Sequence, residues 1–229
     1  MNAVPSYPVA LRGDLDPRLS RWLWLVKWIL AIPHYVVLFV LWIAFFVLTV
    51  VALFAILVTG RYPRPIFDFN LGVLRWTWRV AFYSYAALGT DRYPPFSLGP
   101  EPDYPATLEV RYPERLSRGL VLVKWWLLAI PHYLVVGAFA GTTGWVAWQS
   151  GNTEVGGMNL VTALVVIAGF ALLFTARYPR GIFELLLGIN RWIVRVGAYV
   201  ALMTDEYPPF RLDPGAREPE VAVAPERAD

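Results

Sequence analysis

The chain has 229 residues, of which 57% are hydrophobic and only 16% are charged, and its formal net charge is +3. Soluble domains normally carry about a quarter charged residues, so this composition argues against a water-exposed globular protein. The absence of cysteine excludes disulfides, zinc–thiolate sites and iron–sulfur clusters, and the small net charge gives little support to a nucleic-acid partner.

The first residues, up to residue 16, are polar and contain proline. They lack the basic region followed by an apolar core that a signal peptide needs. Within them, residues 9–12 form a short extended piece, and residues 107–111 are its counterpart further along the chain. We expect these pieces to pair with residues 96–98 or 210–212, giving short β-strands at the cytoplasmic face.

Residues 22–59 are apolar apart from Lys27. As one helix this run would be about 57 Å long, against roughly 30 Å of membrane hydrocarbon. Two interpretations follow. The run is either a transmembrane hairpin with spans 20–39 and 42–59, or an interfacial helix ending at Pro33 followed by one long span.

We prefer the hairpin, because Arg21 and Arg61 then lie on the same side of the membrane. The segment where the chain would turn, near residues 39–45, contains no Gly, Pro or Asn to mark it.

An amphipathic helix is predicted for residues 65–88. Its polar positions recur in steps of three and four residues, which places them on one helix face; they are Asp68, Gly72, Arg75, Arg79 and Tyr83. We expect the helix to lie in the cytoplasmic interface with its arginines on lipid phosphates. One alternative is that Asp68 pairs with Arg75, and Glu184 with Arg191 in the second copy, on a solvated face. Another is that the helix crosses the membrane, which would give six spans in two inverted halves.

The second half of the chain repeats the first after a Gly/Pro/acidic linker at residues 99–103. Seven short motifs recur in the same order. In the first copy they begin at Tyr7, Arg18, Lys27, Ala31, Arg61, Arg75 and Tyr93, and in the second at Tyr104, Arg115, Lys124, Ala129, Arg177, Arg191 and Tyr207. The first unit is therefore residues 1–99 and the second residues 104–212.

The second unit contains an extra stretch of about eighteen residues between His132 and Arg177. We predict spans at 118–140 and 158–176, joined by a Gly-rich turn without Lys or Arg on the outer side of the membrane. The amphipathic helix of this unit is predicted at 181–203, with Arg191 and Arg195 as further lipid contacts.

The tail, residues 213–229, is rich in Pro, Ala and Glu, and we expect it to be disordered. The predicted fold class is thus an all-α integral membrane protein. It has two tandem repeats, each a transmembrane helical hairpin followed by an amphipathic interfacial helix. Four spans are preferred, and two, three or six are the alternatives.

The repeated Pro-His-Tyr, Arg-Tyr-Pro-Arg, Arg-Trp-x-x-Arg-Val and Tyr-Pro-Pro-Phe motifs resemble a bacterial, mainly actinobacterial, membrane family catalogued as domain of unknown function 4389. The resemblance covers residues 7–98 and 104–212. It implies a multi-spanning membrane protein, and it implies no activity, cofactor or catalytic residue.

The only two lysines and only two histidines of the chain occupy matching places, Lys27 with His34 and Lys124 with His132. Ionisable groups in membrane segments are costly and suggest a function, here a proton or anion site. The alternative is structural: Lys27 snorkels to the headgroups and His34 bonds a carbonyl that Pro33 leaves free.

We see no recurring nucleophile–base pair, phosphate loop or metal-binding carboxylate cluster, and we predict neither enzymatic activity nor a cofactor. The favoured function is a membrane scaffold or accessory subunit. Its predicted partners are a bilayer with anionic headgroups and a membrane protein or a second copy. The alternative is a small proton-coupled transporter that uses the Lys/His pairs. We predict a multi-pass protein of the cell's inner membrane with both termini in the cytoplasm.

Overall fold

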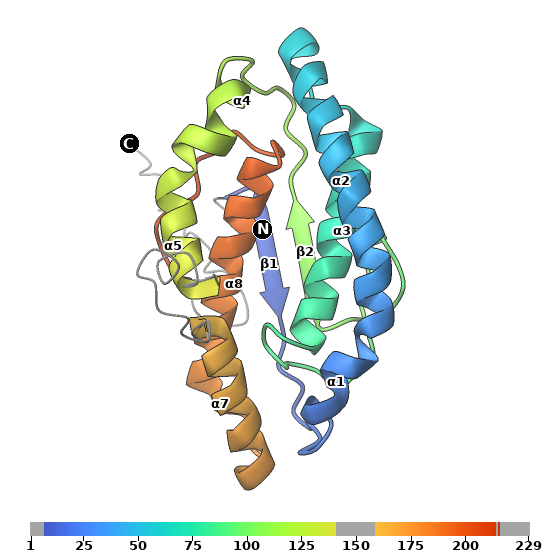
Figure 1. Ribbon diagram of the computed structural model, residues 1–229, viewed down its shortest axis with the longest axis vertical. Helices are drawn as coiled ribbons and strands as arrows, with labels where there is room; N and C mark the ends of the chain where they lie inside the picture. Colours follow the sequence, from blue (N-terminus) through green and yellow to red (C-terminus); the bar gives the residue numbers. More distant parts are fainter. Residues whose placement is uncertain (1–6, 141–158, 214, 216–229) are drawn as a thin grey trace, which may run out of the picture.

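The computed structural model describes residues 7–140, 159–213 and 215 (Figure 1). The elements in chain order are β1 (Val9–Gly13), α1 (Trp24–Leu30), α2 (Ile32–Thr59), α3 (Arg64–Tyr83), β2 (Ala106–Val110), α4 (Leu120–Val123), the π-helical turn η1 (Lys124–Leu128), α5 (Ile130–Ala140), α7 (Leu160–Thr175) and α8 (Arg180–Val200). The chain is mostly helical, as the sequence predicts. The Gly-rich turn of the second unit and most of the tail lie outside the described residues.

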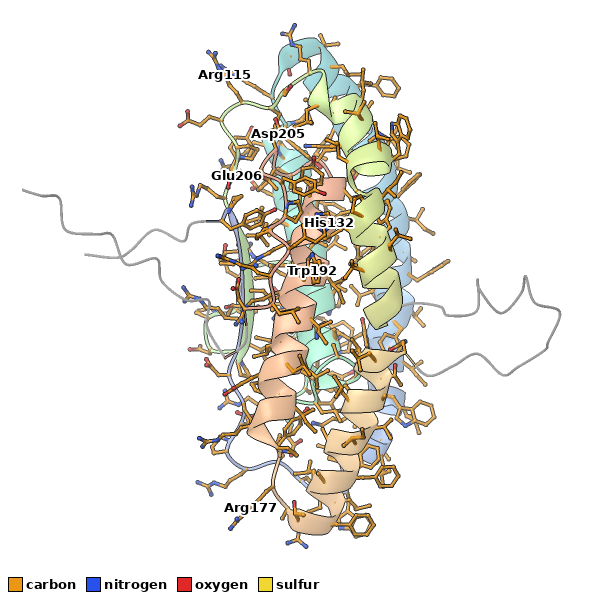
Figure 2. The ribbon with its side chains drawn as sticks, turned by 90° about the vertical axis from the view of Figure 1, so that its left-hand side faces the viewer. Arg115, His132, Arg177, Trp192, Asp205 and Glu206 are labelled. Carbon is orange, nitrogen blue, oxygen red and sulfur yellow. The ribbon has the colours of Figure 1, made fainter. Side chains whose placement is uncertain are left out.

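The elements form three layers. Strands β1 and β2 make a two-stranded ribbon, against which α3 and α8 pack as a middle layer. Helices α2, α5 and α7 cover the other side of α3 and α8. Figure 2 views this arrangement from the side, with the ribbon on the left and the outer helices on the right.

The two units are related by an approximate two-fold axis. In the antiparallel ribbon, Leu11 pairs with Leu108, and these leucines occupy matching positions in the two repeats. An antiparallel pair has a two-fold axis perpendicular to the ribbon at such a point. Accordingly α1 lies at one end of the long axis and α4 at the other, and α2 and α7 run in opposite directions (Figure 1).

The hairpin that the sequence predicts in the first unit is wrong. Residues Ile32–Thr59 form one helix, so spans 20–39 and 42–59 do not exist as such. The long apolar run contains no Gly, Pro or Asn after Pro33, so nothing interrupts its backbone hydrogen bonds. The helix begins after Ala31 and ends before Gly60. The left-handed φ of 71° at Gly60 suits a residue without a Cβ.

The second unit contains no antiparallel hairpin among the described residues either. Helices α5 and α7 follow one another along the long axis in both views (Figures 1 and 2). Together they take the place that α2 has in the first unit. The extra stretch therefore interrupts the counterpart of α2. The predicted span 118–140 is helical but bends at Ala129, and the predicted span 158–176 corresponds to α7.

The amphipathic helices exist but are not interfacial. The predicted ranges 65–88 and 181–203 correspond to α3 and α8, with α3 ending at Tyr83. Both are largely buried, because one side faces the ribbon and the other faces the outer helices. Their polar face is turned toward a layer of protein.

The two short strands form as predicted, but their partners differ. They pair with each other, and neither pairs with residues 96–98 or 210–212 in the described part of the chain. Each strand packs on the middle helix of the opposite unit, since β1 contacts α8 and β2 contacts α3. The units consequently exchange strands across the two-fold axis.

Two helical segments within the described residues are long and apolar enough to cross a membrane by length and composition, Ile32–Thr59 and Leu120–Gly137. Helix α7 is also apolar but shorter. The four-span arrangement is therefore not found in the first unit, where a single helix replaces the two predicted spans.

Candidate functional site

Each unit contains the same cluster of polar and aromatic side chains, built around the Lys/His pair. The first cluster consists of Lys27, His34, Trp76, Tyr83, Asp91, Tyr93 and Phe96, and the second of Lys124, His132, Trp192, Tyr199, Asp205, Tyr207 and Phe210. The outer helices supply the Lys and His, the middle helix supplies Trp and the first Tyr, and the segment after the middle helix supplies the rest.

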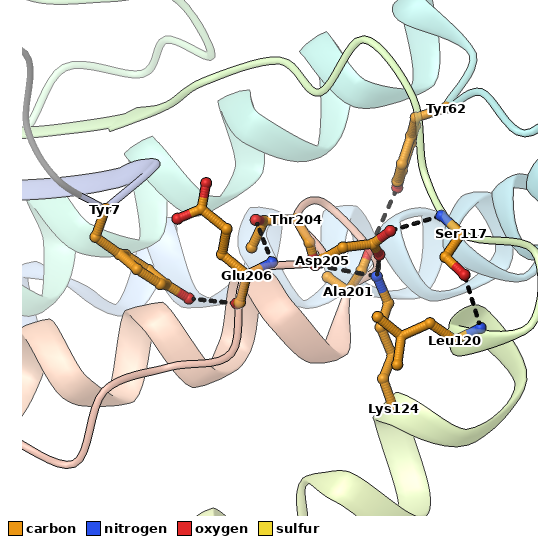
Figure 3. Close-up of polar contacts among 9 residues, drawn as sticks. All are labelled: Tyr7, Tyr62, Ser117, Leu120, Lys124, Ala201, Thr204, Asp205 and Glu206. Carbon is orange, nitrogen blue, oxygen red and sulfur yellow. Dashed lines mark hydrogen bonds and ion pairs between the residues drawn. The ribbon is translucent and has the colours of Figure 1, made fainter.

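Both lysines are buried in ion pairs. Lys27 Nζ lies 2.8 Å from Asp91 Oδ1 and donates to the Thr90 carbonyl at 2.6 Å. In the second cluster Lys124 Nζ lies 2.7 Å from Asp205 Oδ1 and donates to the Thr204 carbonyl at 3.0 Å (Figure 3). The lysines therefore do not snorkel to a headgroup layer.

The carboxylates fix the start of the outer helices as well. Asp205 Oδ2 accepts the backbone N–H of Ser117 at 2.6 Å, and Asp91 Oδ2 accepts that of Ser20 (Figure 3). The buried ammonium group of Lys27 faces the carboxylate of Asp91, which supplies an opposite charge at hydrogen-bonding distance. The ion pair thus offsets part of the desolvation cost of the ammonium group.

Both histidines are held in a neutral form by a tryptophan. His34 Nδ1 accepts the indole N–H of Trp76 at 3.0 Å, and His132 Nδ1 accepts that of Trp192 at 3.1 Å. Since this nitrogen accepts, the proton of the neutral ring is on Nε2. The Nε2 atoms are buried and have no hydrogen-bond partner in the described part of the chain.

The Tyr-Pro-Pro-Phe motif closes over each histidine. The His34 ring stacks on Phe96 at 4.0 Å between centroids, and the His132 ring stacks on Phe210 at 4.3 Å. Tyr93 Oη donates to the Leu30 carbonyl at the bend between α1 and α2. The carbonyl at this bend is thus satisfied by a tyrosine, whereas the sequence suggested His34.

Lysine and histidine of one cluster are connected only through aromatic rings. Lys27 Nζ lies 5.2 Å from the centre of the Tyr83 ring, Tyr83 contacts Tyr93 edge-on, and Tyr93 contacts His34. No hydrogen bond joins Lys27 to His34 in the described structure. Within the described side chains, aromatic rings therefore separate the ammonium group from the imidazole.

The two clusters lie toward opposite ends of the molecule. Lys27 belongs to α1 and Lys124 follows α4, and these helices mark the two ends in Figure 1. In Figure 2, Asp205 and His132 lie in the half opposite to Arg177. The structure thus does not bring the four predicted site residues together.

The predicted lipid contacts are wrong for the four arginines of the middle helices. Arg79, Arg191 and Arg195 are buried, and Arg75 is mostly covered. Their polar face meets backbone carbonyls of the ribbon and the segments beside it. The lone pairs of these oxygens need donors, and a guanidinium supplies several in one plane.

Two of these arginines tie the units together in the same way. Arg75 Nε donates to the Leu108 carbonyl and Arg191 Nε to the Leu11 carbonyl, each at 3.0 Å. Each bond joins a middle helix to the strand of the opposite unit. Arg75 also pairs with Glu109, and the expected pairing with Asp68 does not occur, because Asp68 pairs with Arg64.

The remaining two arginines hold the segments that follow the middle helices. Arg79 donates to the carbonyls of Ser97 and Gly99. Arg195 pairs with Asp213 at 2.8 Å. Asp213, which the sequence places in a disordered tail, is therefore buried and bound.

Sequence reasoning missed the partners of the Lys/His pairs. Asp91 and Asp205 lie outside the motifs by which the repeat is recognised, and Trp76 and Trp192 belong to the Arg-Trp-x-x-Arg-Val motif. The signal that could have found them is their repetition, since Thr-Asp-x-Tyr-Pro-Pro-Phe begins at Thr90 in one unit and at Thr204 in the other. Among the described residues, no group of His, Asp and Glu is arranged to hold a metal ion.

A comparison with protein families relates the chain to a known family. The model of a family described as domain of unknown function (DUF4389) matches residues 21–97 and 158–211, more than half of the chain. The matched ranges include the outer helix, the middle helix and the Tyr-Pro-Pro-Phe motif of the first unit, and the corresponding part of the second unit from α7 onward. Searches of curated proteins and of solved structures find no match.

Proposed function

Because the chain belongs to the DUF4389 family, which is defined without an activity, we propose from its own geometry that it is a non-enzymatic membrane scaffold or accessory subunit. The two Lys/His clusters serve the fold in this proposal. Each ties the start of an outer helix to the segment that follows the middle helix.

The observation that carries the proposal is the exposed apolar surface of the outer layer. In the most apolar part of α2, only 17% of the residues are buried against the rest of the chain. Large side chains along this helix point outward, among them Phe39, Phe46 and Phe54. Soluble monomers rarely expose a continuous apolar surface of this kind, and lipid is the solvent that suits it.

The charge distribution supports the inner membrane, with the ribbon side in the cytoplasm. Arginine is abundant at the edges of the apolar layer, and basic residues are retained on the cytoplasmic side. Tyr7 and Gly215, the first and last described residues, both lie beside the ribbon, where Arg195 contacts the Tyr7 ring and Arg191 bonds the Gly215 carbonyl. Both termini would then be cytoplasmic.

Transport by the Lys/His pairs is the competing proposal, and it finds less support. The pairs lie in separate clusters, and the ammonium groups already have carboxylate partners. A scaffold needs no path between the two ends of the molecule.

The test is reconstitution of the full chain into liposomes. We expect the chain to remain with the lipid after a carbonate wash and to produce no flux under a pH gradient. His34→Ala/His132→Ala is the matched variant. A flux that this variant abolishes would establish transport, and recovery of a monodisperse chain without detergent or lipid would reject a membrane role.

A further inference from the structure

We propose that the molecule lies flat in one leaflet, with its long axis in the membrane plane and its approximate two-fold axis along the membrane normal. Helices α1, α2, α5 and α7 and the turn η1 enter the acyl region of a leaflet containing anionic phospholipid, and the ribbon faces water. This inference rests on the proposed membrane role. It holds that the apolar helices enter one leaflet from one side and that none of them crosses the bilayer.

Measured along the long axis of the molecule, the charged ribbon lies level with the middle of α2, which is incompatible with α2 crossing the bilayer as a lone span. The strands occupy the middle of the long axis (Figure 1), and α3 lies between them and α2 (Figure 2). Arg12 and Glu109 are exposed on them, and Arg111 is exposed directly after β2. If α2 crossed the bilayer, these charges would lie near its centre. Placing an arginine side chain there costs at least about 2.5–3.5 kcal/mol of free energy. The backbone groups at the open edges of the strands would also have no water to bond.

The arginines at the two ends of the molecule point to the same conclusion. Exposed arginines flank the apolar layer at both ends; they are Arg18, Arg21, Arg177 and Arg180 at the end of α1, and Arg61, Arg64, Arg115 and Arg118 at the end of α4. Figure 2 places Arg115 and Arg177 at these opposite ends. If the long axis crossed the bilayer, four of the eight arginines would lie on each side of the membrane, which contradicts the positive-inside rule. The flat orientation puts all eight at one surface.

Exposed tryptophans occur near both ends as well. Trp22 and Trp28 belong to the region of α1, and Trp125 and Trp126 to η1. Tryptophan prefers the boundary between headgroups and acyl chains. A molecule lying in that boundary can place all four indoles there together.

An apolar groove opens on the same layer. It has a volume of about 350 Å³ and lies between α2 and the end of α8, lined by Trp42, Phe46, Val50, Trp125 and Leu202 among others. Phe46, Val50 and Trp125 are themselves exposed, so the groove reaches the outer surface. Its walls offer water almost no hydrogen-bond partner, whereas an acyl chain of the same leaflet fits their chemistry.

The depth of three positions along α2 distinguishes the two orientations. Val36, Phe46 and Val58 are exposed near the start, the middle and the end of the helix. Because the chain has no native cysteine, Val36→Cys, Phe46→Cys and Val58→Cys can each carry one nitroxide label in the full chain. We expect electron paramagnetic resonance with oxygen and a nickel chelate to give nearly equal depths, about 5–10 Å below the headgroups.

A side-of-membrane test accompanies the depth measurement. Arg115→Cys and Arg177→Cys should react with an impermeant maleimide from the same side of sealed proteoliposomes, and Arg12→Cys should react from that side too. Circular dichroism confirms that each variant is folded.

The outcomes separate this inference from the proposed function. A depth profile that peaks at Phe46, with Arg115→Cys and Arg177→Cys labelled from opposite sides, would overturn the flat orientation and leave the membrane scaffold intact. Nitroxides that sense no lipid at any position would overturn both.

Discussion

The buried ion pairs are the residues at which a single substitution should have the largest effect. Lys27→Met removes the ammonium partner of Asp91, whose side chain is 24% exposed and can regain part of its hydration. Breaking a fully buried pair costs about 3–5 kcal/mol, so we expect a loss of about 2 kcal/mol in the free energy of unfolding. Chemical unfolding in detergent micelles measures it.

A double substitution shows whether the charge itself is the cause. Lys27→Met/Asp91→Leu removes both charges, and we expect it to recover at least half of the loss, because apolar pairs often replace buried ion pairs at little cost. The exposed Arg21→Met should change stability by less than about 0.5 kcal/mol. Equal losses in the single and double variants would contradict the assignment.

Tyr62 provides a prediction in the alkaline range. It accepts a hydrogen bond from Asn70 Nδ2 at 2.9 Å, and burial raises its pKa from 10.0 to about 12. Above pH 10 the unfolded chain loses this proton while the folded chain retains it, so stability falls as pH rises from 10 through 12, by about 1.4 kcal/mol per pH unit.

Tyr62→Phe removes both the hydrogen bond and this titration. We expect the variant to be less stable than the unsubstituted chain by about 1 kcal/mol at pH 8, and the difference to close near pH 11. Denaturant titrations at pH 8, 10 and 11 follow the difference. A difference that stays constant across these pH values would show that Tyr62 does not titrate as argued.

The partners of the arginines on the middle helices cannot be predicted from the sequence. The spacing of Arg75 and Arg79 correctly puts them on one face of a helix, but a polar face fits water, headgroups or buried carbonyl groups equally well. Which of these partners the arginines meet depends on the ribbon. The ribbon forms between segments almost a hundred residues apart in the sequence. The sequence alone contains no local signal for that contact.

Among the elements, the outer helices show what repetition can and cannot predict. The repeat correctly relates the first unit to the second, and both middle helices are found within a few residues of their ends. The hairpin fails because it was transferred from the second unit, where the extra stretch between His132 and Arg177 suggested a turn. In the structure, α5 and α7 on either side of that stretch together take the place of α2.

The interruption leads to a prediction about the length of the extra stretch. Matching motifs are offset by 98 residues at His34 and His132 and by 116 residues at Arg61 and Arg177. Deleting residues 141–158 restores the offset of 98 residues at Arg61 and Arg177, and we expect it to join α5 to α7 as one helix in register with α2. We expect the shortened chain to keep its helical circular dichroism and to unfold within about 1 kcal/mol of the full chain.

A shorter deletion is the matched control. Removing residues 141–156 leaves two extra residues, which turn α7 by roughly 200° in a continuous helix. Its buried positions, such as Val165 and Leu172, would then face outward. We expect this variant to be clearly less stable, and equal stability of the two deletions would mean that α5 and α7 are not the two halves of one helix.

At the scale of the whole molecule, the two repeats are one folding unit. The ribbon takes one strand from each, Arg75 and Arg191 reach across to the opposite strand, and Tyr62 Oη donates to the Ala201 carbonyl (Figure 3). Repeat boundaries in the sequence are therefore not boundaries of independent domains. Sequence similarity between the units reports their shared origin and symmetry, whereas autonomy depends on contacts that only the structure reveals.

This interlocking predicts how the chain behaves when it is divided at the linker. Fragments 1–101 and 102–229 each contain a middle helix whose natural strand lies on the other fragment. We expect neither fragment to form a stable monomer in detergent, and the two fragments to co-elute as a one-to-one complex when they are expressed together. Size-exclusion chromatography with light scattering measures the masses.

Fragment 1–101 should also form a homodimer, because its own strand can occupy the place of β2. Leu11 would then pair with Leu11 of the second copy, and Arg75 of each copy would bond the Leu11 carbonyl of the other, as Arg191 does in the full chain. Arg75→Met should weaken this dimer, since it removes the donor on both sides, and the exposed Arg64→Met is the control. A monomeric fragment 1–101 that unfolds cooperatively would show that the first unit does not need an exchanged strand.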